Sequence, residues 1–327
     1  MFFICVLSIR GYGQSSGAME KETQTAMSEL YKDVQYLDQR INYHAQVAIG
    51  GCNYEVLIND YPVDRYFGPA NGTVSGSVPI NTAILEPGEQ TWKIRIYPVR
   101  NPVEKDGQVT LVPQSSISDG ARVSMTIEGI RFKENGDIEK RFGEVLAFEA
   151  PLEKDDETGA SLFADTGKPF VEYSGTFEAD VPYELAGWEN SGDLTAEDSV
   201  ALHQELLAAY QQFHGWLQAG DLESIATAKL DAEREKAQAL FYDKKTNDHF
   251  LSNFTARWGQ PGLDMQPLQN PELRLYGNGK LATLIDVIDD GSPLWGNYQL
   301  DNGNYRHNTY LLYFHRPKGK GKLEVIR

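Results

Sequence analysis

Cysteine is scarce in this chain, and so is positive charge. The 327 residues include two cysteines, Cys5 and Cys52. Because Cys5 lies in an amino-terminal segment that we expect to be removed, Cys52 would stand alone and no intrachain disulfide would form. We interpret Cys52 as a small buried apolar residue, since its neighbours in the sequence offer no basic group that would activate a thiol.

Lysine and arginine together number 30, against 47 aspartate and glutamate residues, which gives a formal net charge of -17. A surface of this charge repels a phosphate backbone or an anionic membrane, so we expect no nucleic-acid partner. The carboxyl-terminal segment is the exception, because from residue 305 onward the only acidic residue is Glu324. We interpret the basic residues there as protection of an edge strand or a solvated tail; the alternative is a docking patch for an acidic partner. They are Arg306, Arg316, Lys318, Lys320, Lys322 and Arg327.

No stretch approaches the ~20 consecutive apolar residues of a membrane-spanning helix, so we expect no transmembrane segment. A shorter apolar run at residues 2–9 is followed by Gly11 and Gly13, small residues suited to cleavage by signal peptidase. This pattern predicts a signal peptide at residues 1–13, a mature chain that begins near Gln14, and a periplasmic or secreted protein. The alternative is a cytoplasmic protein whose first residues form a strand.

The most regular stretch runs from residue 195 to residue 243 and contains no proline. Its apolar residues recur every three or four positions, which predicts two helices with core-facing stripes. Thr195, Glu197 and Asp198 resemble a capping box at the start of the first helix. Gly220 and Asp221 suit the end of that helix and the start of the next. The stripe expected on the first helix consists of Val200, His203, Leu206, Leu207, Tyr210, Phe213 and Leu217.

Residues 43–185 alternate between apolar and polar side chains in several short runs separated by turn residues, which predicts an all-β antiparallel β-sandwich. In one run, Tyr54 and Val56 point to one face, and Glu55, Leu57 and Asn59 point to the other. Turns are predicted at Asn71 with Gly72, Glu86 to Glu89, Asp119 with Gly120, and Asn135 with Gly136. Residues 151–168 are interpreted as a long acidic loop.

We therefore predict two domains. A polar, helical lead-in occupies residues 14–42, the β-sandwich residues 43–185, a linker residues 186–194, and an α+β domain residues 195–327. In the last, the helical pair packs on an antiparallel sheet formed after residue 271, with a short helix at residues 248–257 before it. Hairpin turns are expected at Asn278 with Gly279 and at Asn302 with Gly303.

The carboxyl-terminal half resembles a known family. The order of a helix pair, a short helix and a bent sheet, with the junction from Trp216 to Asp221, is similar to the cone-shaped nuclear transport factor 2-like fold. That fold includes isomerases, dehydratases, hydrolases and non-catalytic binding domains, so the resemblance transfers no active site. The whole chain also resembles uncharacterised exported two-domain proteins of Gram-negative bacteria.

Residues 295–316 form the densest cluster of polar and aromatic residues. We predict one strand over residues 305–315, in which His307 and His315 lie ~26 Å apart at ~3.3 Å per residue and cannot share a metal ion. One of them with Asp286, Asp289 or Asp290 is a chemically reasonable acid–base pair. The sequence shows no nucleotide-binding loop, metal-ligand motif or nucleophile elbow, and we expect no metal and no cofactor.

A concave α+β domain would hold a mostly apolar pocket with a few polar groups. We predict that aromatic residues line its mouth, with Arg306 or His307 as the polar anchor. The candidate binding residues are Trp258, Trp295, Tyr298, Arg306, His307 and Tyr310.

The function that we favour is an exported, non-catalytic binding protein whose partner is another protein or a small ligand. One alternative is a small-molecule enzyme of the hydrolase or isomerase type that uses the pocket of the α+β domain. Another is a structural or assembly component of the cell envelope.

Overall fold

The computed structural model describes residues 18–69, 72–105, 108–133, 137–288 and 290–327. The predicted signal peptide, Cys5, Asp289 and the turn at Asn135 and Gly136 lie outside the described residues, as does Asn71 of another predicted turn. The β-rich front half and the α+β back half that the sequence predicts are confirmed. The division into two separate domains stays a prediction.

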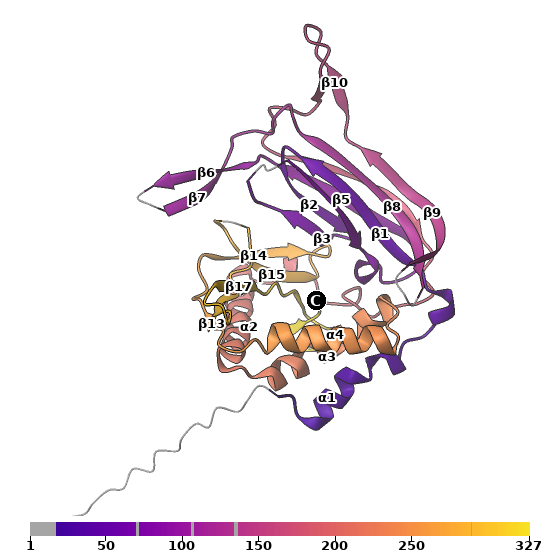
Figure 1. The fold of residues 1–327 in the computed structure, drawn as a ribbon, viewed down its shortest axis with the longest axis vertical. Helices are drawn as coiled ribbons and strands as arrows, with labels where there is room; N and C mark the ends of the chain where they lie inside the picture. The colour runs from indigo at the N-terminus through magenta and orange to yellow at the C-terminus, as the bar shows by residue number, and fades with distance from the viewer. Residues whose placement is uncertain (1–17, 70–71, 106–107, 134–136, 289) are drawn as a thin grey trace, which may run out of the picture.

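Two four-stranded antiparallel sheets make up most of the front half (Figure 1). The first sheet has the order β4 (Thr73–Pro79), β1 (Asn42–Gly50), β8 (Arg122–Phe132), β9 (Ile138–Glu149). The second has the order β12 (Val171–Ala179), β5 (Gly88–Tyr97), β2 (Asn53–Ile58), β3 (Tyr61–Tyr66). The two sheets share one hydrophobic core, to which their strands contribute alternate residues. Cys52 is buried in this core, which confirms its interpretation as a structural residue.

Two hairpins project from these sheets (Figure 1). One consists of β6 (Arg100–Lys105) and β7 (Gln108–Pro113), and the other of β10 (Leu152–Lys154) and β11 (Ser161–Phe163). The second hairpin corrects the prediction of a long acidic loop at residues 151–168. Asp155 closes its turn by accepting hydrogen bonds from the Thr158 backbone amide at 2.7 Å and the Thr158 hydroxyl at 2.6 Å.

The helices of the back half begin where the sequence places an aspartate. The helices are α2 (Ser199–Ala219), α3 (Leu222–Ala239) and α4 (Lys244–Trp258). Their amino-terminal caps are Asp198, Asp221 and Asp243, whose side chains accept hydrogen bonds from the first-turn amides. Gly220 ends α2 in the left-handed conformation, which confirms the predicted junction.

Three details of the predicted helices are wrong. The cap of α2 is Asp198, and Thr195 belongs to a separate 3-10 turn at Leu194–Ala196 that Asp193 caps. Val200 is 63% exposed and lies off the buried stripe. The third helix starts at Lys244, earlier than predicted, because Asp243 supplies a cap there.

Two smaller antiparallel sheets complete the back half. One has the order β13 (Asp264–Met265), β16 (Trp295–Gln299), β17 (Tyr305–Thr309), and the other β14 (Pro271–Tyr276), β15 (Leu281–Asp286), β18 (Phe314–His315), β19 (Glu324–Val325). The single strand predicted over residues 305–315 is therefore wrong. The chain leaves one sheet after Thr309 and joins the other at Phe314, so it bends between the two histidines.

The two halves are packed against each other. In Figure 1, β14 and β15 lie between the sheets of the front half and helices α2 to α4. Leu57 and Leu85 of the front half share a buried cluster with Tyr276 and Tyr313 of the back half, and Trp188 of the predicted linker is part of it. The amide of Gly277 donates to the carbonyl of Asp60 at 2.9 Å.

The two ends of the described chain lie on the back half or at the junction. Helix α1 (Lys21–Ser28) packs on α3 and α4 through Met27, and Leu30, just after the helix, is buried in a cluster with Ala237 and Tyr242. The 3-10 turns Leu30–Lys32 and Leu37–Gln39 lead from it to β1, and a third turn covers Asn81–Ala83. Arg327 lies between the halves, where its guanidinium donates to the Thr82 carbonyl and pairs with Glu235. Among the described residues, no helix combines the length and the apolar character needed to cross a membrane.

Candidate functional site

The outer face of the second front sheet, on the side away from its own core, meets the back half. All six residues of β2 are buried, although a strand with one solvent-facing side alternates in burial. Tyr54, Val56 and Ile58 belong to the core of the front half. Glu55 and Leu57 point the other way and are covered by β14 and its neighbours.

Strand register places a row of alternating charges across this outer face. Glu55 of β2 pairs with Arg65 of β3 on one side and with Arg95 of β5 on the other. Arg95 in turn pairs with Glu172 of β12. The Nε of Arg95 donates to Glu172 at 2.9 Å, so that opposite charges alternate over four strands.

Glu55 is the anchor of this row and is 1% exposed. Its two carboxylate oxygens accept hydrogen bonds from the Tyr276 hydroxyl at 2.6 Å and the Tyr97 hydroxyl at 3.1 Å. Arg65 lies 3.4 Å away and Arg95 3.8 Å away. Burial raises the pKa of both tyrosine hydroxyls, and the negative charge of Glu55 raises it further. Both hydroxyls therefore keep their protons and donate to Glu55. A buried carboxylate with this many partners is held in one position.

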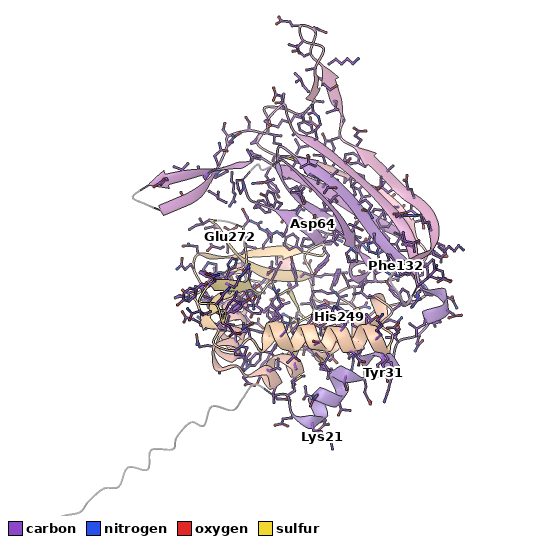
Figure 2. The ribbon with its side chains drawn as sticks, viewed as in Figure 1. Lys21, Tyr31, Asp64, Phe132, His249 and Glu272 are labelled. Atoms are coloured by element: carbon purple, nitrogen blue, oxygen red, sulfur yellow. The ribbon has the colours of Figure 1, made fainter. Side chains whose placement is uncertain are left out.

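Beside Glu55 a hollow of about 430 Å³ opens between the two halves, which we call the interhalf cleft. Burial decreases along β14, from the fully buried Tyr276 through Arg274 to the exposed Glu272. The cleft is therefore closed at Tyr276 and open at Glu272. Figure 2 shows Glu272 on the side of the back half that faces the front sheets. The lining residues are Glu55, Phe67, Arg95, Tyr97, Pro98, Arg100, Pro113, Glu272, Arg274, Val287 and Asp290.

Asp290 joins the two walls of the cleft. Its carboxylate pairs with Arg100 at the base of the β6–β7 hairpin and with Arg274 of β14, the latter at 3.1 Å. Arg100 also donates to the carbonyl of Ile288. The guanidiniums of Arg65 and Arg100 lie 5.2 and 5.5 Å from the centre of the Phe67 ring, so Phe67 is fixed by two cation–π contacts.

A second hollow, of about 480 Å³, lies between α2, α3 and strands β18 and β19; we call it the α2–α3 groove. Phe213, Trp216, Ala228 and Leu323 contribute to its mostly apolar lining. His315 also lines it, and its Nδ1 is 2.8 Å from the hydroxyl of Ser191. Burial lowers the pKa of His315, which favours the neutral imidazole and allows acid–base chemistry.

The structure does not gather the six candidate binding residues at one pocket. Trp258 and Tyr310 are buried in the core of the back half, where their rings lie 4.8 Å apart between centroids. The Tyr310 hydroxyl donates to the carbonyl of Arg257 at 2.9 Å. Trp258 and Tyr310 are therefore held as parts of the core.

The other four candidates lie on the hairpin of β16 and β17. Tyr298 pairs with Arg306 and packs partly on the core, Trp295 is half-buried, and Arg306 and His307 are exposed. In the described part of the chain, none of the six lines the interhalf cleft or the α2–α3 groove. Of the aspartates considered as partners of a histidine, Asp290 lines the cleft, and neither His307 nor His315 is among the described residues that line it.

No group of three or more histidine, cysteine, aspartate or glutamate side chains suited to a metal ion occurs among the described residues. Comparison with protein-family models, with curated proteins and with solved structures finds no match to this chain.

Proposed function

We propose that the protein is an exported, non-catalytic binding protein and that the interhalf cleft is its ligand site. Ligand sites occur preferentially at the junction between structural units, where a few fixed polar groups stand among apolar ones. The cleft has this composition, with three arginines and three acidic residues beside Phe67, Tyr97 and Val287.

The observation that carries the proposal is the fixed position of the cleft's charged groups. Glu55, Arg100 and Asp290 come from segments far apart in the sequence, and each is held by at least two partners. Burying charges costs free energy, and replacing them with apolar residues is often stabilising. This network is open to solvent at one end. Its charged side chains are already fixed, so they lose little conformational entropy when a ligand binds.

The surface around the mouth suits either a small ligand or a segment of a partner protein. Val287 and Ile288 are about half exposed beside the cleft, and Val103 and Val112 are similarly exposed on the hairpin above it. Exposed apolar side chains near a polar cleft are typical of recognition surfaces.

The finer fold assignment is also a proposal. We infer that the front half is a β-sandwich domain, supported by the single core between its two sheets. We infer that the back half is a cone-like α+β domain of the nuclear transport factor 2-like kind. The observation that supports this assignment is that α2 and α3 contribute to one core with β15 and β18.

Filling the cleft tests the proposed site. In Val287→Trp an indole replaces an isopropyl group that is 48% exposed and lines the cleft. The matched control is Val200→Trp, on the exposed face of α2. Both variants are expected to fold, because exposed substitutions usually change stability by about 0.5 kcal/mol or less.

The measurement is a thermal-shift screen of the three proteins against small polar molecules and short peptides. Compounds that raise the Tm of the unsubstituted protein should raise the Tm of Val200→Trp equally and leave the Tm of Val287→Trp unchanged. A ligand raises the Tm only of a protein whose site it can enter. Equal shifts in Val287→Trp would place the site elsewhere and refute the proposal.

The enzyme alternative is favoured by one observation, the pairing of Ser191 with a neutral His315 beside the α2–α3 groove. In that case the imidazole would be a general base or acid for a ligand in the groove. The hydrogen bond occupies Nδ1, which leaves Nε2 as the atom available to a substrate.

A further inference from the structure

We propose that Arg274 anchors the carboxylate of a monoanionic ligand in the interhalf cleft and that Phe67 and Tyr97 receive the apolar part of that ligand. This inference rests on the proposed function, because it assigns a ligand class to the same site.

Most charged residues that line the cleft belong to two connected sets of ion pairs. One connected set of ion pairs, around Glu55, contains three basic and three acidic side chains and is neutral. Its members are Arg65, Lys93, Arg95, Glu55, Asp60 and Glu172. The second set contains two guanidiniums, Arg100 and Arg274, and one carboxylate, Asp290. This set therefore has an excess of one positive charge, and Glu272, the remaining charged residue of the lining, balances that charge only from the exposed mouth of the cleft.

Arg274 is the more exposed of the two guanidiniums and is the one able to offer this charge to a ligand. The Arg100 side chain is 9% exposed and donates to both Asp290 and Ile288, whereas the Arg274 side chain is 29% exposed. A guanidinium has five N–H donors. Arg274 forms an ion pair with Asp290 at 3.1 Å. Donors remain on the side of Arg274 that is open to the cleft, and a planar pair of oxygens is the acceptor that fits them best.

The uncharged part of the lining is aromatic and aliphatic. Phe67 and Tyr97 contact each other with ring centroids 5.2 Å apart, and Pro98, Pro113 and Val287 complete an apolar wall. A ligand that places its charge on Arg274 would lay aromatic or aliphatic atoms against this wall. Apolar atoms removed from water there add to the affinity.

A single negative charge fits this site better than two. One carboxylate neutralises the excess charge of the second ion-pair set. A phosphate monoester carries close to two charges at neutral pH. Its second charge would face Glu272, which is exposed at the mouth of the cleft. Like charges at close range disfavour binding.

A monocarboxylate of this kind has two sources, a small organic acid and the carboxyl terminus of a polypeptide. Four probes separate them: N-acetyl-leucyl-phenylalanine, its carboxamide, 4-phenylbutanoate and phenyl phosphate. Titration calorimetry of the unsubstituted protein is expected to show binding of at least one of the two carboxylates. We expect the carboxamide and phenyl phosphate to bind at least about tenfold more weakly, because they lose or mismatch a charged hydrogen bond. Tighter binding of the dipeptide would indicate that the natural ligand is the carboxyl terminus of a polypeptide. Tighter binding of phenylbutanoate would indicate that it is a small organic acid.

Arg274→Gln tests the anchor, with Arg306→Gln on the exposed face of β17 as the matched control. The affinity for the preferred carboxylate should fall by at least about tenfold in Arg274→Gln and stay unchanged in Arg306→Gln. The carboxamide comparison needs no variant, so it decides the matter even if Arg274→Gln fails to fold.

The inference is overturned if neither carboxylate binds, if the carboxamide binds as tightly as the acid, or if Arg274→Gln retains full affinity. The proposed function fails separately, by the result of the Val287→Trp screen. Suppose that the ligands found are neutral and bind the unsubstituted protein but not Val287→Trp. That result would support the cleft as the ligand site and refute the proposal that Arg274 anchors a carboxylate.

Discussion

The two sheets of the front half share one core, yet their outer faces are used differently. Gln46 of β1, Ser77 of β4 and Thr126 of β8 lie on the outer face of the first sheet and are exposed or half-buried. On the second sheet, the corresponding face carries Glu55, Leu57, Arg95 and Tyr97. Short hydroxyl and amide side chains make a surface that water can cover. Long charged and aromatic side chains need partners when buried, and here β14 supplies them.

A glutamate–arginine pair occurs on both outer faces, which makes the comparison testable. Glu55→Ala would leave Arg65 and Arg95 without their buried carboxylate, and we expect it to lower the free energy of unfolding by about 3–5 kcal/mol. Glu128→Ala removes the partner of the mostly exposed Arg141 on the first sheet and should cost about 0–1 kcal/mol. Urea unfolding of the three proteins measures both values. Equal costs would mean that the two faces are equivalent.

Leu57→Ala sharpens the same comparison with an apolar group. Leu57 points away from the front core and is fully buried in the cluster that joins the halves. Its truncation should cost about 2–5 kcal/mol, as in an ordinary core. Thr126→Ala, on the outer face of the first sheet, should stay within about 0.5 kcal/mol. A small effect of Leu57→Ala in thermal and urea unfolding would show that the junction contributes little to stability.

Much of the local structure was predictable, because it depends on residues close together in the sequence. Asp221 and Gly220 mark the junction of α2 and α3 by capping and by left-handed geometry. Alternation along β1 and β8 indicates their buried faces. The sequence also held a sign of the second interface: Leu57 is apolar at a position where a solvent-facing strand residue is usually polar.

The candidate site was not predictable by the same means. Arg95, Arg100, Arg274 and Asp290 lie on four separate segments, and each alone is typical of a solvated position. Only packing of the two halves brings them to one cleft. The cluster at residues 295–316 has a different difficulty, because its alternating pattern does not show which aromatic residues are buried. Tyr310 lies in the core of the back half with Trp258.

The interhalf cleft is the site at which we propose that ligands bind. The most direct measurement is methyl NMR on protein labelled at valine, leucine and alanine, titrated with each compound that raises the Tm. If ligands bind in the cleft, we expect the methyl signals of Val287 to shift and those of Ala209, Ala228 and Leu323 in the α2–α3 groove to stay unchanged. Shifts at those three residues with Val287 unchanged would contradict it and would favour a site around His315.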